Sequence, residues 1–223
     1  MESIVRKVLD HYFRDVLNRV NDLETAMEVL VNSPLYVHAS EVGFNGVQGR
    51  KKIFVDLLNE GEIKHIVETG TYLGDTSAYM ATTSGVPVST CEQNKKLYSL
   101  AKLRLKDMPL VTLFNLDSRV FLKNLSQDKK FTESECFFYL DAHWGKDLPL
   151  KEEISIIASC WDKFIIMIDD FKVPDDNGYI HDSYGTLKYI NMPMLKSKYN
   201  LSCYFPSKPS TEEIKPPTGC VVL

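Results

Sequence analysis

The chain has 223 residues, of which 44% are hydrophobic and 25% are charged, an ordinary composition for a globular protein with one sizeable core and an appendage. Its formal net charge of −4 argues against a general phosphate-binding surface, so we expect no nucleic-acid partner. No apolar run reaches the roughly 20 residues that span a bilayer, and the first residues lack the apolar segment of a secretory signal. We therefore expect a cytoplasmic protein with no membrane partner.

The cysteines agree with that expectation. There are five of them, they are scattered, and no C-x-x-C pair occurs. An odd number without such spacing is typical of a reducing compartment, so we expect structural thiols and no disulfide framework.

The chain begins with a helical pattern. Between Glu2 and Leu30, apolar residues recur at helical spacing with charges between them, which predicts one long helix or two shorter ones. Asn32-Ser33-Pro34 ends this pattern, and the glycine- and asparagine-containing run from Ala39 to Gly49 is typical of a connector. We therefore assign residues 1–49 to an N-terminal helical extension and connector, and residues 50–223 to the main domain. The extension is expected to pack against that domain or to form a homo-oligomer contact, with a lid as the alternative.

The main domain alternates between apolar runs and helix-compatible sequence. Five runs are expected as strands, at residues 66–67, 88–91, 111–114, 137–140 and 164–168. Two more strands are expected at Leu201 to Phe205 and Gly219 to Leu223, joined by a hairpin-like connection. Alternating strands and helices predict an α/β fold: a doubly wound, Rossmann-like, mostly parallel sheet of seven strands. Ligands of such sheets bind at the carboxyl ends of the strands.

A glycine turn follows the first strand. Residues His65 to Ser77 read as a buried strand that breaks into a turn and then a helix. Gly70 and Gly74 can adopt backbone angles closed to other residues and let a ligand approach the main chain, while the helix offers unpaired amides. The spacing Glu-x-Gly-x-x-x-Gly differs from the Gly-x-Gly-x-x-Gly of dinucleotide-binding folds. The turn therefore predicts a nucleotide-like ligand and argues against a bound pyrophosphate.

Polar residues also end the second and third strands. Glu92 ends the second strand about twenty residues after the glycine turn, where an acid can accept hydrogen bonds from both hydroxyls of a ribose. The alternative is a solvated carboxylate, but its coincidence with the glycine turn favours a nucleoside. Asp117 and Ser118 end the third strand and are candidates to cap the following helix, to contact an adenine edge, or to do both.

Acids and a histidine end the fourth and fifth strands. Asp141 and His143 follow the fourth apolar run, and Asp169 and Asp170 follow the fifth. The carboxyl ends of neighbouring strands should bring the three acids together, and hard oxygen donors with room for water suit Mg²⁺. The alternative is that Asp169 caps a loop and that Asp170 pairs with a lysine or an arginine.

With these residues placed, the chain from Phe44 to Leu223 resembles class I S-adenosylmethionine-dependent methyltransferases. The resemblance implies a loop that binds the methionine and ribose of S-adenosylmethionine, made of Glu68, Thr69, Gly70, Thr71, Tyr72, Gly74 and Ser77. It also implies that Glu92 binds the ribose hydroxyls and that Asp117 and Ser118 lie on the adenine side. These enzymes share a sheet whose last strand is antiparallel to the others, which would make Gly219 to Leu223 the inserted strand.

A finer resemblance concerns the acceptor side. The chain is similar to a little-characterised bacterial subgroup, itself similar to the macrocin-type sugar O-methyltransferases, at residues 44–46, 139–144, 168–171 and 178–179. In macrocin-type enzymes, the acid that ends strand four and the two acids that end strand five hold magnesium, and a base follows the first acid. The resemblance thus implies that Asp141, Asp169 and Asp170 bind Mg²⁺. It also implies that Asp141 contacts the cofactor and takes part in catalysis, with His143 as the catalytic base.

The expected function is O-methylation of a small hydroxylated acceptor, sugar-like or a natural product. The enzyme would align S-adenosylmethionine with the acceptor, Mg²⁺ would bind two acceptor oxygens, and His143 would remove the proton, with His181 as a second candidate base. One alternative is a methyltransferase-like protein that binds the nucleoside without catalysis, as a sensor or assembly partner. The other is an NAD-dependent oxidoreductase, against which the glycine spacing argues.

Overall fold

The structure is a computed structural model. It describes residues 13, 16–18, 20, 42–142, 147–182, 199, 201–213 and 217–223. The chain divides into two units, Met1–His38 and Ala39–Leu223. The stretch from Ala39 to Gly49, which we assigned to the connector, therefore belongs to the second unit.

The described residues of the first unit are helical, as the sequence periodicity predicts. They are Phe13, Val16, Leu17, Asn18 and Val20, and all are exposed. The four apolar residues stand at positions i, i+3, i+4 and i+7, which is one face of a helix. The role of this helix in packing or in a homo-oligomer stays a prediction.

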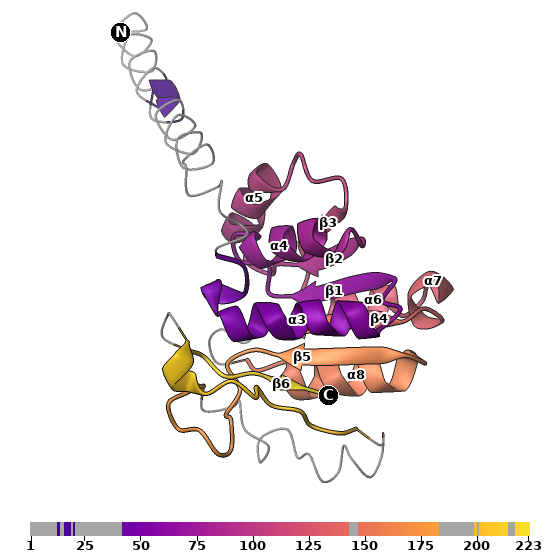
Figure 1. Ribbon diagram of the computed structural model, residues 1–223. Helices are drawn as coiled ribbons and strands as arrows, with labels where there is room; N and C mark the ends of the chain where they lie inside the picture. Colours follow the sequence, from indigo (N-terminus) through magenta and orange to yellow (C-terminus); the bar gives the residue numbers. More distant parts are fainter. Residues whose placement is uncertain are drawn as a thin grey trace, which may run out of the picture. The chain divides into compact units, whose positions relative to one another are not determined.

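The second unit is built on one twisted sheet (Figure 1). Its strands are β1 (His65–Thr69), β2 (Val88–Cys91), β3 (Val111–Phe114), β4 (Cys136–Leu140), β5 (Phe164–Ile168) and β6 (Val221–Val222). The strand order is β3-β2-β1-β4-β5-β6, with β6 antiparallel to β5 and the other neighbours parallel. The order reverses between β1 and β4, the place where open α/β sheets bind ligands at the carboxyl ends of their strands.

The predicted seventh strand is wrong for the part of the chain that the structure describes, which has six strands. The segment Leu201 to Phe205 makes a single antiparallel bridge, between Tyr204 and Val222. Its two hydrogen bonds, Tyr204 N to Val222 O and Val222 N to Tyr204 O, are both 2.9 Å long. A longer ladder does not form because β6 offers only two residues and because Pro206 has no amide hydrogen to donate.

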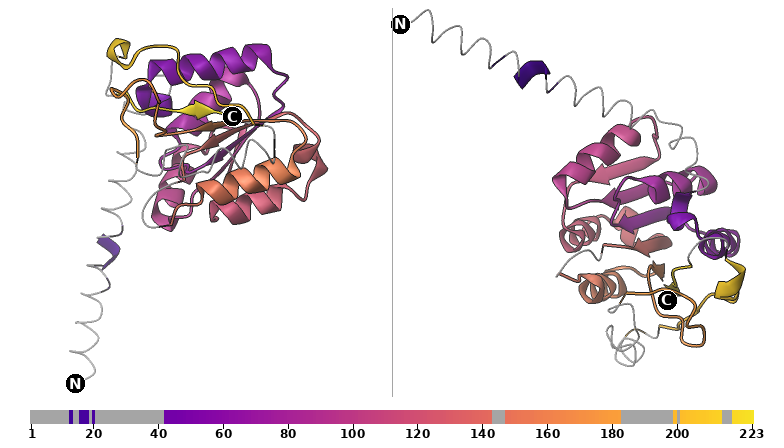
Figure 2. Two further views of the ribbon diagram at one scale, coloured as in Figure 1. Left: turned by 90° about the horizontal axis from the view of Figure 1, so that it is seen from below. Right: turned by 90° about the vertical axis from the view of Figure 1, so that its left-hand side faces the viewer.

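Helices cover both faces of the sheet (Figure 2). The helical elements are η2 (Gly43–Gly46), α3 (Gln48–Glu60), α4 (Asp75–Ser84), α5 (Lys95–Arg104), α6 (Ser118–Leu125), α7 (Lys129–Thr132), α8 (Leu150–Cys160) and η3 (Ser210–Glu212). Side chains of Asn94, Asp117 and Asp128 accept hydrogen bonds from the first amides of α5, α6 and α7, as N-cap residues do. None of the helices in the described ranges combines the length and the hydropathy that crossing a membrane requires.

Alternate residues of the central strands face opposite cores. Phe138 and Leu140 of β4 pack in one core with α6 and α8. Phe137 and Tyr139 pack in the other core with α3 and α4. Because side chains alternate along a strand, Tyr139 points toward α3, which carries Arg50.

Candidate active site

A cavity of about 940 Å³ lies at the carboxyl ends of the parallel strands. Its volume is within the roughly 300–1,000 Å³ of small-molecule sites. Most of the predicted site residues line it: Gly70, Thr71 and Tyr72 after β1, Glu92 after β2, Asp117 and Ser118 after β3, Asp141 after β4 and Asp170 after β5. We call the part formed by Asn45, Asp141, Asp170 and Thr218 the β4–β5 end of the cavity.

The glycine turn is held tightly between its neighbours. Gly70 has φ 89° and Gly74 has φ 86°, the left-handed region that favours glycine. The amides of Gly70 and Thr71 donate to the carbonyl of Cys91 at 3.0 and 3.1 Å. A Cβ on Gly70 would lie 2.6 Å from the carbonyl carbon of Asp141 and nearer still to its oxygen. Only glycine therefore allows the main chain of this turn to lie against the end of β4.

Backbone strain is concentrated around the cavity. Among the described residues, four non-glycine residues have positive φ: Phe44, Asn45, Tyr72 and Asp170. The last three line the cavity, and Phe44 adjoins Asn45. Each such residue costs roughly 1–2 kcal/mol and persists only where its surroundings hold it, which happens most at functional sites. Asn45 was not among the residues predicted for the site, and only its place in the subgroup resemblance pointed to it.

Glu92 joins the glycine turn to the end of β2. Its Oε2 accepts a hydrogen bond from Tyr72 N at 2.9 Å, and its Oε1 accepts one from Asn94 N at 2.7 Å. The side-chain amide of Asn115 donates to the carbonyl of Glu92 at 2.7 Å. A carboxylate has about four acceptor positions, so this immobilised group keeps capacity to accept hydrogen bonds from ligand hydroxyls.

Asp117 caps α6 and also lines the cavity. Its Oδ1 accepts hydrogen bonds from the amides of Arg119 and Val120 at 2.9 and 3.4 Å. The Arg119 side chain donates to Asp117 and also to Asp147, with Nη2 2.7 Å from Asp117 Oδ2 and 2.6 Å from Asp147 Oδ2. The hydrogen bonds from the Arg119 side chain hold the pKa of Asp117 below its usual value. Sequence reasoning missed Arg119 and Asp147, because no local pattern distinguishes them from solvated charges.

Four of the predicted loop residues do not line the cavity: Glu68, Thr69, Gly74 and Ser77. Glu68 is buried, and its Oε2 accepts hydrogen bonds from Ser77 Oγ and, at 2.7 Å, from Thr90 Oγ1. The hydrogen bonds of Glu68 therefore join β1 to α4 and to β2. Burial raises the pKa of Glu68 to about 7.

This shift predicts a pH-dependent contribution of Glu68 to stability. Folding raises the pKa of Glu68 from 4.5 to about 7, so between these values the folded protein binds more protons than the unfolded chain and its stability falls as the pH rises. Glu68→Gln remains uncharged and can still accept from Ser77 and Thr90. Between about pH 4.5 and about pH 8, the stability of the variant relative to the wild type should rise by up to about 3 kcal/mol.

Urea unfolding across this pH range measures the difference. Exposed Glu60→Gln is the control and should keep a constant offset from the wild type. Parallel stability curves for Glu68→Gln and the wild type would contradict the prediction.

The three predicted metal ligands divide into two environments. Asp141 and Asp170 line the cavity, whereas Asp169 is fully buried behind it and forms an ion pair with Arg50. Burial raises the pKa of Asp141, and the charges of Asp169 and Asp170 raise it further. Burial also raises the pKa of Asp169, with Arg50 opposing the shift.

Within the described ranges, no three histidine, cysteine or acidic side chains lie where they could hold a metal ion. The guanidinium of Arg50 occupies the position next to Asp169, so the residues at this place do not fit Mg²⁺. The structure shows the alternative pairing of Asp170 with an arginine. This arginine, Arg50, also pairs with Asp169. Arg50 precedes Asp170 by 120 residues, and no local pattern predicted their contact.

One of the two predicted bases, His181, falls within the part of the chain that the structure describes. His143 lies outside the described residues, so its role as base stays a prediction. His181 is exposed and is not among the residues that line the cavity.

No protein-family model and no curated protein sequence matches the chain. Solved structures do resemble it. An O-methyltransferase from Bacillus cereus in complex with SAH has a TM-score of 0.57 and 17% identity, over 78% of this chain and 79% of that one. The O-methyltransferase TomG from Streptomyces achromogenes, in complex with SAM, has a TM-score of 0.57 and 16% identity over 78% of each chain.

A third similar structure covers more of the chain. A putative caffeoyl-CoA O-methyltransferase from Staphylococcus aureus has a TM-score of 0.57 and 17% identity, over 92% of this chain and 96% of that one. At such identities the likeness establishes the fold. The chain has the Rossmann-like fold of S-adenosylmethionine-dependent methyltransferases, as its sequence resemblance predicted.

Proposed function

We propose that this protein is an S-adenosylmethionine-dependent methyltransferase that methylates a hydroxyl oxygen of a small, sugar-like or natural-product acceptor. One observation carries the proposal: a single cavity at the reversal of strand order combines the Gly70 turn, the immobilised Glu92 carboxylate and the capped start of α6. Structures of the same fold hold SAM or SAH. Because one fold can serve many chemistries, the proposal rests on the residues of the site and not on the fold alone.

The residues present suit a nucleoside that carries an amino acid. Gly70, where a Cβ would collide with Asp141, leaves the main chain open to the methionine side of the ligand. Glu92 would accept hydrogen bonds from the ribose hydroxyls, and Asp117 and Ser118 would lie along the adenine. Asp141 would face the positively charged ammonium group. When bound, S-adenosylmethionine supplies a methyl group whose bond to sulfur breaks as the acceptor oxygen bonds to its carbon, the electron pair passing to sulfur.

The other residues of the β4–β5 end, Asn45, Asp170 and Thr218, would bind the acceptor. Their carboxylate, amide and hydroxyl groups can orient an acceptor hydroxyl by hydrogen bonds, and such positioning supplies a large part of the rate enhancement of transfer reactions. His143, two residues after Asp141 in the sequence, would take the proton that the hydroxyl loses. An unperturbed histidine pKa of about 6.5 suits a general base near neutral pH.

Ligand binding and turnover test the two parts of the proposal. S-adenosylhomocysteine, the demethylated product, should raise the melting temperature of the wild type, because a ligand at 100 times its Kd adds about 2.7 kcal/mol. His143→Ala should bind it equally well but transfer labelled methyl to a pool of hydroxyl compounds about 10²–10⁴ times more slowly.

His181→Ala is the matched control and should retain both properties. Absence of any melting shift at millimolar ligand would refute the methyltransferase function. Full activity of His143→Ala would remove this histidine from the mechanism. Binding without turnover over a broad acceptor pool would favour the alternative, a nucleoside-binding protein that does not catalyse.

A further inference from the structure

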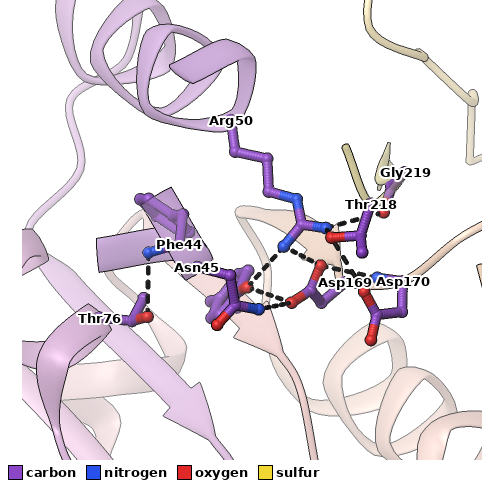
Figure 3. A network of polar contacts seen from close by, with 9 residues as sticks. Phe44, Asn45, Arg50, Thr76, Asp169, Asp170, Thr218 and Gly219 are labelled. Carbon is purple, nitrogen blue, oxygen red and sulfur yellow. Dashed lines mark hydrogen bonds and ion pairs between the residues drawn. The ribbon is translucent and has the colours of Figure 1, made fainter. Parts of the chain in front are cut away.

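A buried guanidinium, that of Arg50, contacts the two acids that follow β5 (Figure 3). Arg50 comes from the first turn of α3, and its side chain is 1% exposed. Its Nη1 pairs with Asp169 Oδ1, and its Nη2 lies 3.5 Å from Asp170 Oδ1. The same Nη2 donates to Thr218 Oγ1 and, at 3.3 Å, to the carbonyl of Gly219. One arginine therefore joins the end of β5 to the C-terminal segment.

The carboxylate of Asp169 is fully engaged. Its Oδ1 accepts the ion pair with Arg50 and a 2.7 Å hydrogen bond from Asp170 N. Its Oδ2 accepts hydrogen bonds from Tyr139 Oη at 2.7 Å and from Asn45 Nδ2 at 3.3 Å. Four contacts match the roughly four acceptor positions of a carboxylate. A metal ion could use Asp169 only by displacing one of these partners.

The positive charge of Arg50 is permanent. Burial, the largest influence, would lower the pKa of Arg50, but the surrounding charges, led by Asp169, outweigh it and hold the pKa above its ordinary value. An arginine is in any case protonated at every pH that a folded protein meets. A divalent cation between Asp141, Asp169 and Asp170 would be repelled by this charge at close range.

Resting on the proposed methyl transfer, we propose that Arg50 supplies the positive charge that a divalent cation would bring to the β4–β5 end, so that the reaction needs no metal ion. Arg50 is a positioning residue, since it does not line the cavity. It neutralises Asp169, and its contact with Asp170 holds the carboxylate of a residue whose backbone is in the left-handed region, with φ 47°.

The proposal widens the acceptor class beyond compounds with two adjacent oxygens. A metal ion binds an acceptor through two adjacent oxygens, whereas hydrogen bonds to Asn45, Asp170 and Thr218 need one hydroxyl. The acceptor loses its proton to the protein base and forms the new bond through that one oxygen. Compounds with a single hydroxyl should therefore be methylated as readily as compounds with two adjacent hydroxyls.

Binding of Mn²⁺ to the full-length protein tests the proposal without knowledge of the acceptor. Each protein is first titrated with S-adenosylhomocysteine and then with Mn²⁺, whose free form is followed by electron paramagnetic resonance. The wild type should bind no Mn²⁺ up to millimolar concentration. Arg50→Ala, which leaves the acids without their counter-ion, should gain a Mn²⁺ site and be stabilised by the ion. An arginine that only packed beside the acids, without neutralising them, would not produce this gain.

Lys52→Ala removes an exposed cation from the same helix and should behave as the wild type. Stoichiometric Mn²⁺ binding to the wild type that Asp169→Asn abolishes would overturn the proposal, and so would a folded Arg50→Ala without a Mn²⁺ site. If Arg50→Ala does not fold, the wild-type titration decides. Failure of the wild type to bind S-adenosylhomocysteine refutes the methyltransferase function and is scored separately.

The acceptor pool gives a second measurement. Single-hydroxyl compounds should be methylated, and a chelator should leave the rates unchanged. Turnover restricted to compounds with adjacent hydroxyls, or lowered at least tenfold by the chelator, would also overturn the proposal.

Discussion

Arg50→Met should lower the free energy of unfolding by about 3–5 kcal/mol, the cost of breaking a buried ion pair by removing one partner. The substitution leaves the fully buried carboxylate of Asp169 without its cation. It also removes the donors to Thr218 and Gly219, which attach the C-terminal segment. Methionine is similar in length, so an empty cavity contributes little to the loss. Urea unfolding measured by circular dichroism gives the free energy directly.

A second substitution identifies the cause of this loss. In Arg50→Met/Asp169→Asn, the buried side chain is neutral. Its oxygen, in the place of Oδ1, can still accept a hydrogen bond from the amide of Asp170, and its NH2 group, in the place of Oδ2, can donate one to Tyr139 Oη. The double variant should therefore recover a substantial part of the lost stability. Equal instability of the single and double variants would show that lost packing, and not an unpaired charge, is responsible.

Gly70→Ala should have the largest effect on ligand binding. Alanine at φ 89° costs roughly 1–2 kcal/mol, and its Cβ would lie 2.6 Å from the carbonyl carbon of Asp141. The carbonyl carbon and oxygen of Asp141 are main-chain atoms, so the clash can be relieved only if the turn moves away from the end of β4. We expect a further loss of about 1–3 kcal/mol in stability and at least a tenfold weaker binding of S-adenosylhomocysteine, about 1.4 kcal/mol.

Gly85→Ala is the matched control at the other end of α4. Gly85 also has positive φ, 67°, but a Cβ there would meet nothing within 4 Å. Its substitution should cost about 1 kcal/mol of stability and leave ligand affinity unchanged, as calorimetry can verify. Equal effects of the two substitutions on affinity would mean that the Gly70 turn is not part of the binding site.

The parts of the fold that local sequence predicts are those that depend on neighbouring residues. An apolar run bounded by glycine or acids is sufficient to identify a buried parallel strand, and the glycine spacing predicts a turn with left-handed residues. Once the strands are parallel, their carboxyl ends meet at one edge. For this reason Glu92, Asp117, Asp141 and Asp170 could be assigned to one site from their positions after strands.

The length of pairing at the edge of the sheet was not predictable in the same way. Leu201 to Phe205 has the composition of a strand, yet it contributes a single bridge. Its pairing depends on how many residues of β6 face it, and that number is two. The short partner strand, together with Pro206 directly after the segment, limits the ladder.

The sequence by itself determined that the acids at the ends of β4 and β5 stand at one edge of the sheet, because chain order and strand direction require it. Only the tertiary structure decided what each acid does. Asp169 turns inward to Arg50, Tyr139 and Asn45, while its neighbour Asp170 lines the cavity. The physical reason is that a buried carboxylate must find a counter-charge and hydrogen-bond donors, and these come from segments distant along the chain. Local pattern places a charge at a strand end, and three-dimensional packing selects its partner.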